Sequence, residues 1–208
     1  MIRRGLTFAV FAFLVCLSSS LANITNVTYA SDNDGAFTCT PWSWTDVSGV
    51  SELPVSVSGD QYWAPGHLIL NVLTTGGDDP TLKIDNSIDN ETDFDWTKFT
   101  VNLYMAVDFT LTNVTVTAPG DWSVVSGDNQ TAAWNGSEYV ATVVYDTGTA
   151  IPNDGISTID FGYWVKFSGS PSYTLTQEMI PVPEPSTLAL VAVGGLFLVR
   201  FVSRRGRK

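Results

Sequence analysis

The body of this 208-residue chain has very few basic residues. Between residues 23 and 180 there are three lysines (Lys83, Lys98 and Lys166), no arginine and twenty of the 21 acidic residues, which gives this span a net charge of −17. A surface this acidic repels nucleic acid and anionic lipid, because both carry dense negative charge. We therefore expect neither as a binding partner of the body.

Cysteine and histidine are also scarce. Cys16 lies in the first 22 residues, which have the layout of a cleaved secretion signal, so Cys39 has no partner with which to form an internal disulfide. A small buried hydrophobe is the usual role of such a cysteine. One cysteine and one histidine, His67, are too few for a tetrahedral zinc site, and no Gly-x-Ser-x-Gly nucleophile motif occurs. These shortages favour a protein that is not an enzyme and whose stability comes from packing or from bound ions.

The body also lacks any sustained helical period. Short runs of alternating apolar and polar residues are separated by Gly, Pro, Asn and Asp, which is typical of strands and turns. The predicted strands are 24–30, 36–40, 53–58, 67–73, 81–84, 99–105, 109–117, 139–145, 159–167 and 173–179. The dense apolar run 67–73 suggests a strand buried on both faces. Most of the predicted strands carry their apolar residues on one face only. Such strands predict an all-β fold, an antiparallel β-sandwich of the immunoglobulin-like or jelly-roll type.

The first 22 residues have the layout of a secretion signal. Arg3 and Arg4 precede an apolar run from Leu6 to Leu17, and Ser20-Leu21-Ala22 provides the small residues that signal peptidase requires. We therefore expect a signal peptide at 1–22, cleaved by signal peptidase, and an acidic β-sandwich domain at 23–180.

The C-terminal 28 residues differ from the body. Pro181 to Pro185 are polar and rich in proline, which disfavours a helix or a central strand. Leu188 to Val199 is an apolar run of twelve residues, shorter than the roughly 17–25 that a lasting membrane span needs. A basic cluster follows, which favours retention of this end in the cytoplasm. The cluster consists of Arg200, Arg204, Arg205, Arg207 and Lys208. A short transmembrane helix is predicted, and a plain C-terminal anchor stays open as the alternative.

The order of these features resembles a known signal. Pro183-Glu184-Pro185, then a short apolar segment containing glycine, then an arginine cluster resembles the PEP-CTERM sorting signal of bacterial exported proteins, over residues 182–208. With Pro181 included, we expect the sorting signal to form a separate unit at 181–208. The resemblance implies that an exosortase, a membrane-embedded transpeptidase, processes the chain near Pro183, Glu184 and Pro185. It also implies transient contact with the inner membrane as an anchored precursor, followed by delivery to the cell surface, the outer envelope or the extracellular space. The family's association with extracellular polysaccharide implies a structural or adhesive part in a biofilm matrix.

Acidic residues concentrate between Asp85 and Asp95, which we expect to form a loop. Calcium accepts many carboxylate and carbonyl oxygens, so Asp85, Asp89, Glu91 and Asp93 are candidate calcium ligands. The spacing does not follow the EF-hand pattern. A solvated acidic loop without any ion is the competing interpretation.

Seven tryptophans are present, and Trp42 and Trp44 share one face if their segment is extended. Exposed tryptophans can stack against sugar rings, so these two are candidate carbohydrate-binding residues, and a carbohydrate-binding module is the alternative function. Tryptophans that simply close the core are the competing interpretation. The abundant carboxylates leave a secreted hydrolase as a third hypothesis, because glycosidases use a pair of them.

Overall fold

The computed structural model describes residues 24–31, 35–41, 52–75, 80–146, 148–167 and 172–184. The strands are β1 (Ile24–Ser31), β2 (Gly35–Pro41), β3 (Glu52–Gln61), β4 (Gly66–Thr74), β5 (Thr81–Asn90), β6 (Trp96–Met105), β7 (Phe109–Ala118), β8 (Ser123–Ser126), β9 (Gln130–Thr131), β10 (Ala133–Trp134), β11 (Tyr139–Asp146), β12 (Thr158–Phe167) and β13 (Ser172–Pro183). No helix occurs among these residues, and hence none that could cross a membrane. The predicted signal peptide and membrane helix lie outside the described ranges.

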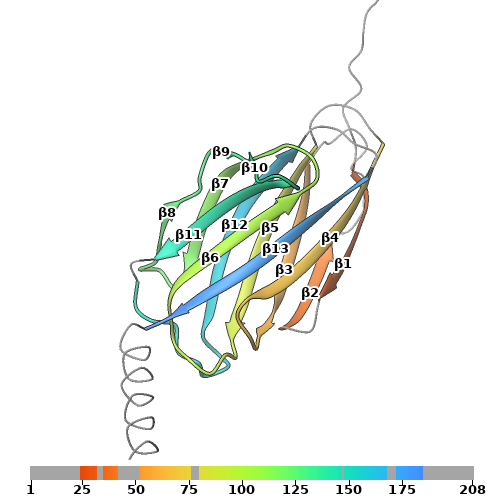
Figure 1. Cartoon of the computed structure of the whole chain (residues 1–208). Coiled ribbons are helices and arrows are strands. Elements are labelled where there is room, and N and C mark those ends of the chain that lie inside the picture. The colour runs from red at the N-terminus through yellow and green to blue at the C-terminus, as the bar shows by residue number, and fades with distance from the viewer. Residues whose placement is uncertain are drawn as a thin grey trace, which may run out of the picture.

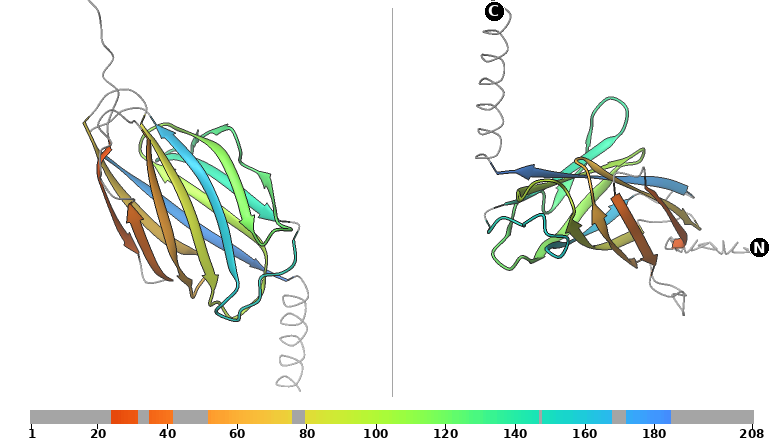
Figure 2. Two further views of the ribbon diagram at one scale, coloured as in Figure 1. Left: turned by 180° about the vertical axis from the view of Figure 1, so that it is seen from behind. Right: turned by 90° about the horizontal axis from the view of Figure 1, so that it is seen from below.

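The strands form two sheets that pack face to face (Figure 1). Sheet I has the order β1-β4-β13-β6-β11-β10, with β8 also paired to β11, and sheet II has the order β2-β3-β5-β12-β7-β9. All paired strands are antiparallel except β3 and β5, which are parallel. The two further views show the same two layers from behind and from below (Figure 2). The predicted β-sandwich is confirmed, with one parallel pair added.

Alternating side chains from both sheets meet in one hydrophobic core. Phe161 of β12 contacts Phe99 of β6 and Tyr145 of β11 across the interface between the sheets, with ring centroids 5.5 and 5.1 Å apart. Offset or tilted aromatic pairs at such distances add to the stabilisation that burial provides. Cys39 lies in this core as a free thiol, and burial raises its pKa to about 11. Its predicted role as a buried hydrophobe is confirmed.

The core also contains a small polar network. The Tyr163 hydroxyl donates to Gln177 Oε1, and Gln177 Nε2 donates to Asn86 Oδ1 over 3.0 Å. These three residues come from β12, β13 and β5, so the network links the two sheets, and each is at most 3% exposed. Because buried polar groups are costly without partners, this network fixes how the sheets align.

Two predictions about strand boundaries and burial are wrong. The segment 85–90 is part of β5 and not a loop, because Ile84 and Ile88 alternate inward while Asp85 and Asp89 face outward. The run 67–73 is not buried on both faces, since the outward side chain of Leu73 in β4 is 46% exposed. In both segments, the alternation of side chains along the strand determines which residues are buried, and the density of acidic or apolar residues does not.

The last strand extends further than its proline content suggests. Pro181 and Pro183 belong to β13 and pair with Phe99 and Trp96 of β6, so the proline-rich segment begins as the end of a strand. The pairing of β13 with β4 ends at Met179, so residues 180–183 pair with β6 alone. Prolines are tolerated there because a sheet edge does not require a backbone donor on its open side.

Candidate ligand groove on sheet I

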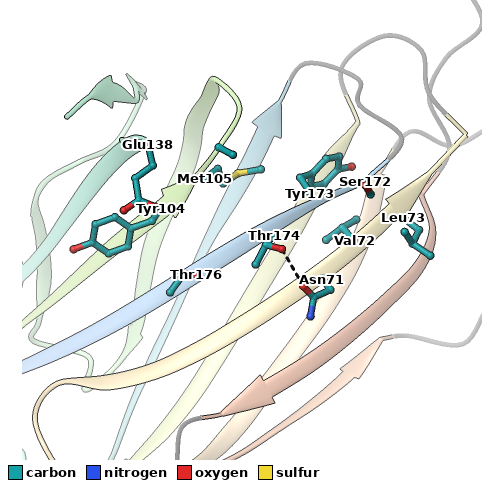
Figure 3. Close-up of a pocket in the computed structure, with 11 residues that line it drawn as sticks. Asn71, Val72, Leu73, Tyr104, Met105, Glu138, Ser172, Tyr173, Thr174 and Thr176 are labelled. Atoms are coloured by element: carbon teal, nitrogen blue, oxygen red, sulfur yellow. Dashed lines mark hydrogen bonds between the residues drawn. The ribbon is translucent and has the colours of Figure 1, made fainter. Parts of the chain in front are cut away.

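A groove of about 580 Å³ lies on the outer face of sheet I (Figure 3). Thr174 and Thr176 of β13 lie between larger side chains on either side. Tyr104 of β6 and Glu138, just before β11, lie to one side, and Asn71 of β4 lies to the other. Small residues on the central strand between larger ones on its neighbours produce the hollow. Thr174 Oγ1 donates to Asn71 Oδ1 over 3.0 Å, which orients both side chains.

A hydrogen-bonded row of side chains continues from this groove across the sheet. Glu178 Oε2 accepts from the Tyr104 hydroxyl at 2.6 Å and from Asn102 Nδ2 at 2.8 Å. Asn102 Oδ1 in turn accepts from Thr142 Oγ1 at 2.8 Å, and His67 Nε2 lies 3.5 Å from Glu178 Oε1. These residues come from β4, β13, β6 and β11, which are neighbours in the sheet. The single histidine is thus held at a strand start by a carboxylate.

The two titratable groups at the centre of this row have shifted pKa values. Partial burial opposes the ionisation of Glu178, but the hydrogen bonds from Asn102 and Tyr104 hold its pKa below the usual value. Burial and the hydrogen bond to Glu178 raise the pKa of Tyr104 to about 12. At neutral pH the face therefore presents an ionised carboxylate, a neutral phenol, amides and hydroxyls. These groups stand on rigid strands, which suits the recognition of a hydrogen-bonding ligand.

The structure tests few of the site residues predicted from sequence. Trp42, Trp44, Pro185, the segment from Leu188 to Val199 and the basic cluster lie outside the described residues. Pro183 and Glu184 are described, and they form the end of β13 and the residue after it.

The four candidate calcium ligands are not gathered into one loop. Asp85 and Asp89 lie four residues apart in β5, while Glu91 and Asp93 follow in the connection to β6. Among the residues that the structure describes, no three Asp, Glu, His or Cys side chains are arranged to hold a metal ion. Burial and the neighbouring Asp60 raise the pKa of Asp89, as expected for two crowded carboxylates. Calcium binding stays a prediction.

The described tryptophans divide between the core and the surface. Trp96 and Trp122 are buried, while Trp63 and Trp134 are 65% and 55% exposed. Trp164 lies on the outer face of sheet II, with the Lys83 ammonium 4.2 Å from its ring centroid.

Tyr104 and Thr174 of the groove, and Glu178 of the hydrogen-bonded row beside it, were not singled out from the sequence. Alternation alone places them on an outward face, but their proximity depends on β13 lying between β4 and β6. Strand order of this kind has no local sequence signal.

Comparison with known proteins identifies the C-terminal segment. Residues 181–208 match the family model described as the PEP-CTERM protein-sorting motif. No curated protein and no solved structure matches the chain. The motif indicates an exported protein that is made as a membrane-anchored precursor and processed by an exosortase for delivery to the cell surface.

Proposed function

We propose that this protein is a non-enzymatic surface protein that holds extracellular polysaccharide, as a structural or adhesive component of a matrix or biofilm. The sorting motif provides the location, since it directs an exported protein to the cell surface. The observation that carries the proposal is the groove on sheet I, where hydroxyl, amide and phenol groups line an open hollow together with the Glu138 carboxylate and apolar side chains such as Leu73 and Met105.

The chemistry of the groove suits a chain of sugars. Sugar hydroxyls both donate and accept hydrogen bonds, and Thr174, Thr176 and Asn71 offer groups of both kinds. The ring of Tyr104 provides a partly exposed aromatic surface beside them. The groove is an open hollow on a sheet face, which leaves room for a polymer to enter and leave. The net charge of −17 favours a neutral or cationic polysaccharide over a polyanion.

The same row of residues supports a binding role over hydrolysis. A glycosidase needs a carboxylic acid whose pKa is raised so that it holds a proton at neutral pH. Glu178 has the opposite shift, because Asn102 and Tyr104 donate hydrogen bonds to its ionised form. Its carboxylate orients neighbours, and we expect no turnover of bound sugar.

The test is binding of the purified protein to a panel of neutral, cationic and anionic polysaccharides. Tyr104→Ala removes both the ring and the hydroxyl, and we expect a Kd at least about tenfold weaker, which corresponds to about 1.4 kcal/mol. Ser56→Ala, an exposed residue on the outer face of sheet II, is the matched control and should bind as the parent does. Unchanged binding in Tyr104→Ala, or no binding to any polymer, would contradict the proposal.

The alternative of a carbohydrate-binding module that uses Trp42 and Trp44 is separated by the same panel. Loss of binding in Trp42→Ala or Trp44→Ala, with the melting temperature unchanged and Tyr104→Ala unaffected, would move the site to those tryptophans. Release of reducing sugar during incubation would instead support the secreted hydrolase.

A further inference from the structure

We infer that Asn135 is a site of spontaneous covalent modification, at which the backbone nitrogen of Gly136 closes a succinimide ring onto the asparagine side chain. The two residues lie in the turn that connects β10 to β11. Asn135 is the one asparagine of the sequence that a glycine follows. Glycine has no Cβ to hinder the approach of its nitrogen to the preceding side chain, so this pair is the most reactive of its kind in the chain.

The hairpin turn holds the side-chain carbonyl of Asn135 in place. Asn135 Oδ1 accepts from the backbone N–H of Ser137 over 2.9 Å and from that of Glu138 over 3.0 Å. It also accepts from Ser137 Oγ over 3.0 Å. The backbone N–H of Asn135 donates to the Glu138 carbonyl oxygen over 3.0 Å, which closes the turn. These bonds keep the Asn135 side chain against the backbone of the turn, which contains the Gly136 nitrogen.

The three donors to Asn135 Oδ1 also favour the reaction electrostatically. Attack on Cγ places negative charge on Oδ1, and fixed donors aimed at an oxygen that becomes negative lower the barrier to acyl transfer. Two of the three donors are backbone N–H groups, which is the usual composition of an oxyanion hole. The folded turn therefore provides an environment that an unfolded Asn-Gly pair lacks.

The turn is open to water and has room for the ring. Asn135, Gly136 and Ser137 are all exposed. Gly136 has a φ of 110°, and apart from its chain neighbours no described residue has an atom within 4 Å of the position that a Cβ would occupy. Ring closure at this turn therefore displaces none of the packed core.

Asn86, which Ser87 follows, provides the internal comparison. Serine is also small, but Asn86 is 3% exposed and lies inside β5, which pairs with both β3 and β12. Its Oδ1 accepts from Gln177 Nε2 over 3.0 Å in the core network. The strand pairing and this bond fix the Asn86 side chain in the core, so we expect no ring closure there in the folded protein.

The chemical step is an acyl transfer within the chain that needs only water as a co-reactant. The Gly136 nitrogen loses its proton and bonds to Cγ of Asn135, while the bond from Cγ to Nδ2 breaks and Nδ2 takes up a proton and leaves as ammonia. Water then adds to one of the two ring carbonyl carbons and breaks its bond to the nitrogen, which gives aspartate or isoaspartate. Either product adds a negative charge beside Glu138, whose side chain lines the groove (Figure 3).

The experiment is to incubate the purified folded protein in neutral buffer and to map its peptides by mass spectrometry over time. Exchange of NH₂ for OH raises the mass of the peptide that contains residue 135, and chromatography separates the aspartate and isoaspartate forms. We expect this peptide to convert steadily, while the peptide that contains Asn86 stays unmodified. No conversion at residue 135 would overturn the inference.

Comparison with the chain unfolded in guanidinium chloride separates the effect of the turn from that of the sequence. Asn135 should react at least about twofold faster in the folded protein, far below the roughly 10²–10³-fold that one donor contributes in an enzyme, because this turn is open to water. Asn86 should react only in the unfolded chain. An Asn135 rate in the folded protein that equals or falls below the unfolded rate would overturn the role of the turn.

Variants of the turn test the donors directly. Ser137→Ala removes the hydroxyl donor and keeps the Asn-Gly pair, so the folded rate should fall while the unfolded rate stays the same. Ser126→Ala, at an exposed position of β8, is the matched control and should react as the parent does. Asn135→Gln should abolish the signal, because ring closure would need a larger ring. An unchanged folded rate in Ser137→Ala would contradict the assistance by that hydroxyl.

Discussion

Gln177 connects the two sheets through hydrogen bonds, so its replacement should cost a large share of the stability. It is fully buried, accepts from Tyr163 and donates to Asn86. Gln177→Leu keeps most of the volume but leaves the Tyr163 hydroxyl and Asn86 Oδ1 without these partners. A buried polar group left unpaired costs about 1–3 kcal/mol, so we expect these two groups together to cost about 2–6 kcal/mol. The total free energy of unfolding of a native domain is only about 5–15 kcal/mol.

The measurement is urea unfolding followed by tryptophan fluorescence, which reports on the buried Trp96. Thr176→Val is the matched control, because it lies next to Gln177 in β13 and faces outward, and it should change the free energy of unfolding by less than about 1 kcal/mol. The double variant Gln177→Leu with Asn86→Leu should recover part of the loss, since one unpaired group has been removed. A cost below about 1 kcal/mol for Gln177→Leu alone would refute the view that this network aligns the sheets.

Three further predictions concern pH, backbone contacts and ions. Burial raises the pKa of Tyr145 and of Tyr163 above the ordinary value of 10.0. The unfolded chain loses these protons first, as it does that of the Cys39 thiol, whose pKa burial raises from 9.0 to about 11. The melting temperature should therefore be steady between about pH 7 and 8 and fall as the pH rises through 9 and 10, and a steady melting temperature up to pH 12 would contradict this. Gly59→Ala should lower the free energy of unfolding in urea by about 1–3 kcal/mol, because the added Cβ would collide with the Ala36 carbonyl oxygen and lie 2.8 Å from Phe37 Cα. Ser58→Ala, beside it in β3, is the control and should be nearly neutral. If Asp85, Asp89, Glu91 and Asp93 bind calcium, a thermal scan should show a higher melting temperature with calcium than with chelator, and identical scans would remove that hypothesis.

The fold was largely predictable from alternation, and the exceptions have physical causes. Each of the ten predicted strands overlaps an observed one because their apolar residues recur with a period of two, although the predictions for β5 and β13 end several residues early. The short strands β8, β9 and β10 were missed because they bury little and carry no such pattern. The stretch from Asp85 to Asn90 looked like a loop because of its charge, yet Ile88 holds it in the sheet.

The candidate groove was much less accessible to sequence reasoning. Tyr104 and Glu178 are separated by 74 positions and meet only because β13 inserts between β4 and β6. The sorting signal, in contrast, is local and ordered along the chain, so it was identified from the sequence and is confirmed by the family match. Its overlap with the end of β13 could be seen only in the structure.

Chemical-shift mapping by NMR would show whether the outer face of sheet I binds a sugar chain. Oligosaccharide fragments of a polymer that the protein binds are titrated into the isotope-labelled protein. We expect saturable shifts concentrated at Asn71, Tyr104, Thr174 and Thr176, with sheet II unaffected. Shifts concentrated on Ser56, Ser87 and Thr115 of sheet II, or no saturable shifts at all, would contradict it.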